Sequence, residues 1–186
     1  MKRVIAVIIC LMLFLTACSG NSKFDESNIN SYVGAGELTV INALVKSNGF
    51  FVEEVFVANS LPYDSENTIE TENGTFAPVT SDKFESYADF EKKIRSTYTE
   101  AASNEILSGD KYSNIDGKLY FNLSYETDTT EKYLLDWSEV TAEAVINADG
   151  LYEITAKVKG TAGLPKEVSL LAANENGNIR LMALYS

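Results

Sequence analysis

The chain has 186 residues, a formal net charge of −12, two cysteines and no histidine. With 45% apolar and 11% aromatic residues, it can bury a core and is not a disordered acidic tail. Its acidity excludes nucleic acid as a partner, because nucleic acid needs a basic surface. The missing histidine excludes Ser-His-Asp and Cys-His catalytic groups. Carboxylate chemistry, a Ser-Lys pair and oxygen-bound calcium remain open.

The first 20 residues have the three parts of a secretory signal. Lys2 and Arg3 precede an apolar stretch from Val4 to Leu15, whose 12 residues are too few to span a bilayer. The sequence LTACSG follows, with small residues directly before Cys18. A cysteine at the cleavage site resembles the signal of bacterial lipoproteins. This resemblance implies removal of residues 1–17 and attachment of lipid to Cys18.

The lipoprotein signal predicts an extracytoplasmic protein that is anchored to the cell membrane by lipid at its N-terminus. Removing residues 1–17 from 186 leaves 169, and removing the charges of Lys2 and Arg3 changes −12 to −14. We expect a polar tether at 18–32 and a single domain at 33–186. The remaining chain has no thiol apart from Cys18, and the usual zinc ligand sets are therefore absent. The alternative is an ordinary signal peptide with a chance cysteine.

The first predicted helix covers residues 36 to about 58, where apolar residues recur every three or four positions. Asn48-Gly49 interrupts the pattern, so the segment fits one broken helix or two short ones. The apolar residues between 50 and 57 fit a strand as an alternative.

Two further helices are expected at 86–97 and about 99–107. Ser86 is followed three residues later by Asp89, which is typical of a helix start. Gly109 is expected to end the second helix.

Hairpin signals dominate the remaining sequence. Turn-forming residues separate four pairs of strand-like segments, which are 68–71 with 75–79, 112–115 with 118–123, 140–146 with 151–158, and 167–173 with 178–184. Pro78 has no N–H to donate, so its strand is expected at a sheet edge. The expected fold class is α+β, a curved antiparallel β-meander with N-terminal helices packed on one face.

Part of the sequence resembles a known family over roughly residues 80–160. The residues concerned are a helix that ends in Tyr98-Thr99, a second helix, the Asp-Gly-Lys-Leu turn at 116–119 and a Leu-x-x-Trp that ends at Trp137. They resemble the IseA-type inhibitors of bacterial D,L-endopeptidases. The resemblance implies a protein without enzyme activity that blocks cell-wall hydrolases with a cysteine nucleophile.

The resemblance also implies that an acidic loop binds the hydrolase. Here the loop is residues 122–132, and Glu126, Asp128 and Glu131 are its candidate partner-binding residues. A carboxylate there could pair with the imidazolium of a thiolate–imidazolium site. The chain departs from the family in having a lipoprotein signal and no glycine in this loop. A solvated loop is the alternative, and the residue spacing of a calcium-binding loop is missing.

Other candidate residues have an ordinary structural interpretation beside the functional one. Trp137 fits a core position better than a ligand platform. Tyrosines in the sheet region could bind sugars or peptides, but strand propensity also explains them; they are Tyr112, Tyr120, Tyr125, Tyr133 and Tyr152. Glu53/Glu54 and Glu70/Glu72 are nominal acid and base pairs, and sequence does not give the separation that such catalysis requires.

We therefore expect a lipid-anchored inhibitor of a cell-wall D,L-endopeptidase that needs no metal or cofactor. The alternative is a small-ligand or protein-binding module, because a curved sheet backed by helices resembles NTF2-like domains, which enclose a pocket in the concave face. A deep apolar pocket lined by tyrosines would favour the binding module. A filled core with a protruding acidic loop would favour the inhibitor, and a cleft with paired carboxylates of raised pKa would favour an enzyme.

Overall fold

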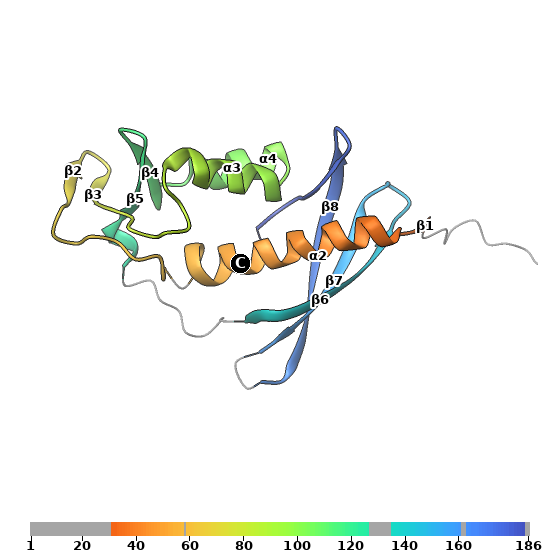
Figure 1. Ribbon diagram of the computed structural model, residues 1–186. Helices are drawn as coiled ribbons and strands as arrows, with labels where there is room; N and C mark the ends of the chain where they lie inside the picture. Colours follow the sequence, from red (N-terminus) through yellow and green to blue (C-terminus); the bar gives the residue numbers. More distant parts are fainter. Residues whose placement is uncertain (1–30, 58, 127–134, 161–162, 185–186) are drawn as a thin grey trace, which may run out of the picture.

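The computed structural model describes residues 31–57, 59–126, 135–160 and 163–184. The predicted lipidation site Cys18 and the predicted contact residues Asp128 and Glu131 lie outside the described residues, as does Tyr133. The predicted α+β class is confirmed, with a curved antiparallel meander packed against helices (Figure 1). Strand β1 (Ser31–Tyr32) consists of the last two residues of the predicted tether.

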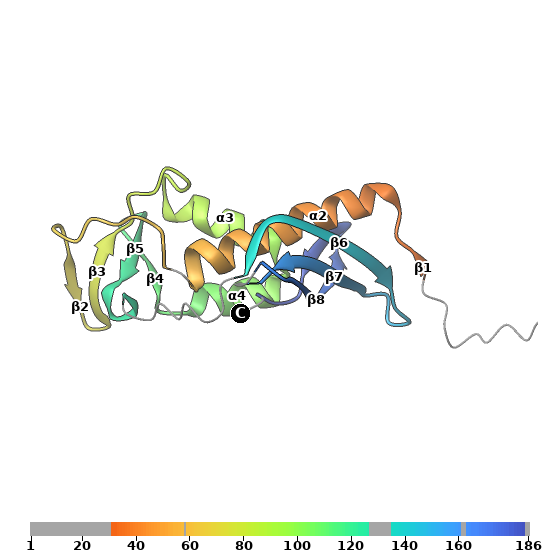
Figure 2. The same ribbon diagram turned by 90° about the horizontal axis from the view of Figure 1, so that it is seen from below.

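Helix α2 (Ala35–Phe50) lies along the middle of an elongated molecule and continues into the π-helix η2 (Phe51–Phe56) (Figure 2). Its buried face follows the predicted helical spacing and consists of Ile41, Leu44, Val45, Asn48 and Gly49. The alternative of a strand at 50–57 is wrong. Asn48-Gly49 does not break the helix, because both residues are buried within it and only the helical pitch changes after Phe50.

The larger sheet has the strand order β1-β6-β7-β8-β9, and all its neighbours are antiparallel. The strands after β1 are β6 (Asp136–Ile146), β7 (Tyr152–Lys159), β8 (Pro165–Glu175) and β9 (Asn178–Leu181). Apolar residues alternate along β7, with Tyr152, Ile154, Ala156 and Val158 buried. These residues share one core cluster with Ile41 and Val45 of α2, so the helix covers this face of the sheet.

Helix side chains satisfy part of the free edge of β6. Asn42 accepts a hydrogen bond through Oδ1 from the N–H of Ala142 at 3.1 Å. Glu53 accepts one through Oε1 from the N–H of Trp137 at 2.9 Å. An edge strand otherwise leaves N–H groups that could pair with another chain. The helix therefore takes the place of a neighbouring strand along this part of β6.

The remaining strands form a second sheet with the order β2-β3-β5-β4, which does not join the meander. They are β2 (Ile69–Thr71), β3 (Gly74–Pro78), β4 (Tyr112–Ile115) and β5 (Lys118–Asn122). Both predicted hairpins are confirmed. The second turns at Asp116 and Gly117, whose φ values of 51° and 81° are those of a primed turn.

The predicted edge position of Pro78 is wrong, because β3 lies between β2 and β5. The residue is tolerated because it is the last of its strand, beyond the three residues that pair with β2. Its carbonyl accepts a hydrogen bond from the N–H of Asp64 at 2.9 Å, while Tyr120 of β5 is its partner on the other side.

Helices α3 (Tyr87–Thr97) and α4 (Glu100–Ser108) confirm the predicted positions. The Ser86 hydroxyl oxygen accepts a hydrogen bond from the N–H of Asp89, and Thr99 caps α4 in the same way through the N–H of Ala102. Gly109 is the C-terminal cap of α4.

In the part of the chain that the structure describes, the core and the residues packed at its margin lie between Val33 and Leu184. Residues 24–186 include all of these positions and are the form of the protein for the proposed experiments. Among the described helices, none combines the length and the hydropathy needed to cross a membrane.

Candidate functional site

The predicted acidic loop begins on a firmly held turn. Strand β5 ends at the buried Asn122, and the 3-10 helix η3 (Leu123–Tyr125) follows. The Asn122 side chain accepts a hydrogen bond from the N–H of Ser124 at 3.0 Å. From the other side, Asn59 donates through Nδ2 to the carbonyl of Tyr125 at 2.8 Å. The position of η3 is thus fixed by contacts before and after it.

Glu126 is exposed and directly follows η3. The hydroxyl of Tyr63 donates a hydrogen bond to its Oε1 at 2.5 Å. The Tyr63 ring packs against Phe121, with 5.2 Å between the ring centroids. Bonding to this carboxylate, followed by burial, raises the pKa of Tyr63, so the phenol remains the donor at neutral pH.

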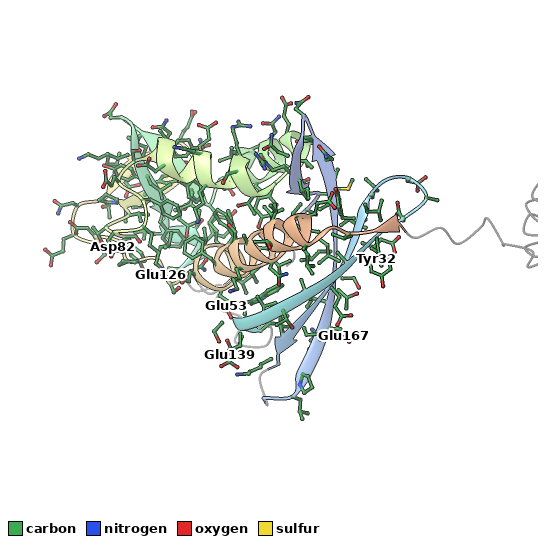
Figure 3. The ribbon with its side chains drawn as sticks, turned by 45° about the vertical axis from the view of Figure 1, so that its right-hand side comes forward. Tyr32, Glu53, Asp82, Glu126, Glu139 and Glu167 are labelled. Atoms are coloured by element: carbon green, nitrogen blue, oxygen red, sulfur yellow. The ribbon has the colours of Figure 1, made fainter. Side chains whose placement is uncertain are left out.

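Glu126 lies in the half of the molecule away from Tyr32, as Figure 3 shows. Tyr32 belongs to β1, which follows the predicted tether.

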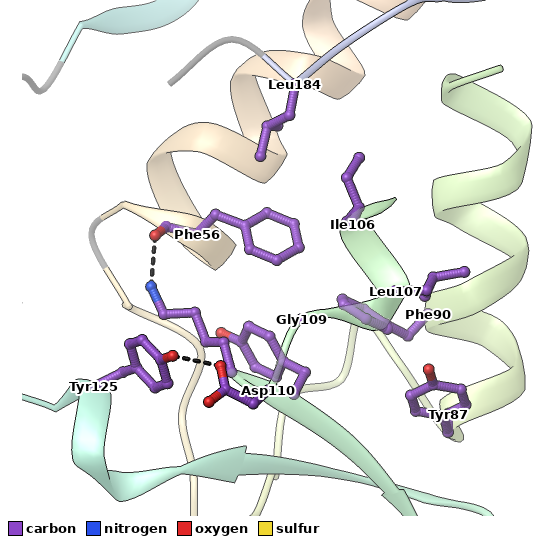
Figure 4. A pocket seen from close by; sticks show the side chains of 11 residues that line it. Phe56, Tyr87, Phe90, Ile106, Leu107, Gly109, Asp110, Tyr125 and Leu184 are labelled. Carbon is purple, nitrogen blue, oxygen red and sulfur yellow. Dashed lines mark hydrogen bonds between the residues drawn. The ribbon is translucent and has the colours of Figure 1, made fainter. Parts of the chain in front are cut away.

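A cavity of about 250 Å³ lies beside the same turn (Figure 4). Its lining is mainly aromatic and aliphatic and comes from η2, α3, α4, β4, η3 and the end of the described chain; it includes Phe56, Phe90, Ile106, Tyr112, Tyr125 and Leu184. The Tyr112 hydroxyl donates to the carbonyl of Val55 at 2.9 Å, and burial raises the pKa of this phenol. The volume is slightly below the range of roughly 300–1,000 Å³ that is usual for ligand pockets.

Polar groups gather at one side of the cavity. The ammonium group of Lys111 donates to the carbonyl of Phe56 at 2.6 Å and lies 5.3 Å from the ring centroid of Tyr125. The Tyr125 hydroxyl bonds to the carboxylate of Asp110. Tyr125 lines the cavity, and Glu126 is the next residue. The 3-10 helix η3, which belongs to the predicted loop, therefore also forms part of the cavity wall.

The concave face expected to hold a pocket in the alternative fold is filled instead. Side chains of α2 share one cluster with those of β6, β7 and β8 there. The cavity lies between the π-helix, the two later helices and the smaller sheet. Sequence reasoning missed it, and also missed Tyr63, because no local pattern connects the residues concerned.

The nominal acid and base pairs have separate structural contacts. Glu53 bonds to the backbone of β6, whereas Glu54 forms an ion pair with Lys83. Burial is the main cause that raises the pKa of Glu53. Glu70 accepts a hydrogen bond from the Thr75 hydroxyl at 2.9 Å. None of these four glutamates lines the cavity beside Tyr125.

The predicted core position of Trp137 is confirmed, since its exposed fraction is 3%. Tyr112, Tyr120 and Tyr152 are also buried, so they do not form an open binding surface. Within the described ranges, no group of three or more acidic side chains is arranged to hold a metal ion. Models of known protein families do not match this chain, and a search of curated proteins finds no match either.

Proposed function

We propose that this protein is a lipid-anchored extracytoplasmic binding protein that inhibits a cell-wall D,L-endopeptidase. The observation that carries the proposal is the position of Glu126. Its carboxylate is exposed, held by the Tyr63 hydroxyl, and lies in the half of the molecule away from Tyr32. Such a position suits a group that must reach a partner in the cell wall while the other end is tethered.

The proposed contact is electrostatic. An acidic segment that starts at Glu126 and includes Asp128 and Glu131 would approach the active-site cleft of the enzyme. Carboxylates bind an imidazolium or a guanidinium through charge-assisted hydrogen bonds, which are roughly twice as strong as neutral ones. The net charge of −12 favours association with a cationic surface. The fixed turn η3 lowers the entropy lost on binding, because the first carboxylate is already positioned.

The test is digestion of peptidoglycan by a D,L-endopeptidase, with and without residues 24–186. We expect slower digestion with the protein, and recovery of the rate when E126Q, D128N and E131Q are combined. No slowing at a large molar excess of the protein would contradict the proposal.

A charge-matched control separates a specific contact from the overall charge. The triple variant E66Q/E72Q/E105Q also removes three negative charges, from exposed positions outside the predicted loop. It should inhibit as the unmodified protein does. Equal loss of inhibition in both triple variants would show that net charge alone is responsible.

A second candidate function is the binding of a small apolar molecule in the cavity beside Tyr125. The aromatic and aliphatic lining, with polar groups at one side, is the observation that favours it. Nuclear magnetic resonance titration with p-cresol should shift signals of the cavity residues. Ile106→Trp would fill the cavity and abolish those shifts, whereas Val40→Trp on the exposed side of α2 would not. Unchanged shifts in Ile106→Trp would contradict this function.

A further inference from the structure

Two arginines of this acidic chain lie together on the surface. The sequence holds three arginines, and the one outside this pair, Arg3, belongs to the predicted signal. Arg95 lies in the last turn of helix α3 and Arg180 lies in strand β9, yet both line one groove of about 300 Å³. This groove is separate from the cavity beside Tyr125 and from Glu126. It has no part in the function proposed above.

The walls of the groove are joined by backbone contacts. The elbow between α3 and α4 docks on β9, with the N–H of Thr99 donating to the carbonyl of Leu181 at 2.8 Å. Tyr98 and Leu181 form a parallel bridge beside it. The β8–β9 hairpin stands next to both helices in Figure 1. The groove is therefore a feature of the packed fold, with both walls fixed relative to each other.

Each guanidinium is held by two of its nitrogens. Arg95 donates through Nε to Glu91 at 2.7 Å and through Nη1 to the side-chain oxygen of Asn104 at 3.0 Å. Arg180 donates through Nε to the carbonyl of Arg95 and through Nη1 to that of Ile179, both at 3.1 Å. Among the described residues, Nη2 of each has no hydrogen-bond partner. The Nη2 group of each arginine is therefore available to a ligand.

The groove also contains acceptors. Glu100 and Glu175 line it, together with the amide side chains of Asn176 and Asn178. One carboxylate oxygen of Glu175 accepts a hydrogen bond from the N–H of Glu100 at 3.0 Å, at the start of α4. Glu100 is exposed to solvent. Two guanidiniums and two carboxylates consequently face the same small space.

We propose that this groove binds a small zwitterion, namely a carboxylate and an ammonium group carried by one amino acid or short peptide. The ligand carboxylate would accept hydrogen bonds from Nη2 of Arg95 and Arg180, which suits the planar geometry of guanidinium. The ligand ammonium group would donate to Glu100 and Glu175. A phosphate dianion meets the two carboxylates and is disfavoured, because like charges at short range repel each other.

The experiment measures binding of four probes to residues 24–186 by nuclear magnetic resonance titration. Alanyl-alanine carries both charges, its N-acetyl form only the negative one, its amide only the positive one, and inorganic phosphate tests a simple anion. We expect the zwitterion to bind at least roughly tenfold more tightly than each other probe, a difference of about 1.4 kcal/mol, because each of the others loses at least one charge-assisted contact. Equal affinity for alanyl-alanine and its N-acetyl form, or for phosphate, would overturn the proposal.

Variants locate the site. R95Q/R180Q should abolish zwitterion binding, and E100Q should remove the preference over the N-acetyl form. K157Q/K159Q also removes two positive charges, from a sheet face away from the groove, and should bind normally. Arg180 also donates to the backbone of Arg95, so R95Q/R180Q could disturb the fold. The variant R95K/R180K tests the same site with both charges retained. Its binding should weaken, and its midpoint of thermal unfolding should not fall. Unaltered binding in R95Q/R180Q, or no binding of any probe at millimolar concentration, would refute the proposal.

Discussion

Gly49 of helix α2 lies in direct contact with the ring of Trp137 in strand β6. A Cβ built on Gly49 would stand 2.5 Å from Cβ of Trp137 and 2.6 Å from its Cγ. These distances are far below an ordinary van der Waals contact. The helix can approach the sheet this closely only because residue 49 has no side chain.

The first prediction follows from this contact. Gly49→Ala should destabilise the protein by about 1–3 kcal/mol, because overpacking outweighs the gain of about 1 kcal/mol in helix propensity. Gly36→Ala in the first turn of the same helix meets no atom within 4 Å and should leave the stability unchanged or raise it. Denaturant unfolding followed by fluorescence of Trp137 measures both. Equal stability of the two variants would contradict this packing.

The second prediction concerns Glu53 and pH. Burial raises its pKa in the folded protein, so its contribution to stability is complete below the ordinary value of 4.5 and is lost as the pH rises through the folded-state pKa. Glu53→Gln keeps an acceptor for the N–H of Trp137 and removes the charge. The variant should therefore be more stable than the original protein at neutral pH and equally stable in acid.

Unfolding curves measured from acid to neutral pH check this expectation. Glu53→Ala is the control, because it leaves the N–H of Trp137 without this acceptor and should destabilise at every pH. A Glu53→Gln variant less stable than the original at neutral pH would contradict the assigned cause.

The third prediction concerns Glu37, whose carboxylate joins the start of α2 to strand β7. The Tyr152 hydroxyl donates to its Oε1 at 2.6 Å, and the N–H of Gly34 donates to Oε2 at 2.8 Å. The bond from Tyr152 is the main cause that lowers the pKa of Glu37. A lowered pKa stabilises the fold above the ordinary glutamate value, and this contribution is lost as the pH falls through the folded-state pKa.

Tyr152→Phe should therefore raise the pKa of Glu37 and lower stability at neutral pH, with a smaller loss in acid. Carboxyl resonances followed by nuclear magnetic resonance give the pKa, and unfolding curves give the stability. Tyr112→Phe is the matched control, since its hydroxyl bonds to an uncharged carbonyl. The loss of stability in Tyr112→Phe should not change across the acid range. A pKa of Glu37 that does not move in Tyr152→Phe would contradict this interpretation.

The fourth prediction separates the position of Glu126 from its charge. Tyr63→Phe keeps the ring against Phe121 but removes the hydroxyl that holds the Glu126 carboxylate. Stability should change by less than about 1 kcal/mol, because the bond is exposed. Inhibition of the endopeptidase should weaken, because the carboxylate is released from its fixed position. Tyr32→Phe, whose exposed side chain lies away from Glu126, should inhibit normally. Unchanged inhibition in Tyr63→Phe would count against a fixed Glu126.

The functional groups were only partly accessible from sequence. The residues around Cys18 predict the compartment and the anchor, and the acidic loop at 122–132 is predicted from the family resemblance of the segments beside it. Tyr63 is 63 positions from Glu126, and Arg180 is 85 positions from Arg95, to whose carbonyl it donates a hydrogen bond. Neither pairing leaves a signal in spacing, because each depends on how whole elements pack.

Local elements, in contrast, are set by residues only a few positions apart. Asp116-Gly117 and Asn176-Gly177 form turns with positive φ at both positions, and the Ser86 hydroxyl caps α3. The energies of turns and caps depend on these neighbouring residues, so local sequence predicts the hairpins, the ends of α3 and α4 and the α+β class.

How these elements combine is seen only in the tertiary structure. It divided the strands into two sheets, placed Pro78 in an inner strand, and put α2 on the concave face where a ligand pocket was the alternative. Many pairings of hairpins satisfy the same alternating pattern, so periodicity alone cannot choose among them. The choice came from burying aromatic side chains, and from contacts such as Gly49 with Trp137 that require a close fit between distant segments.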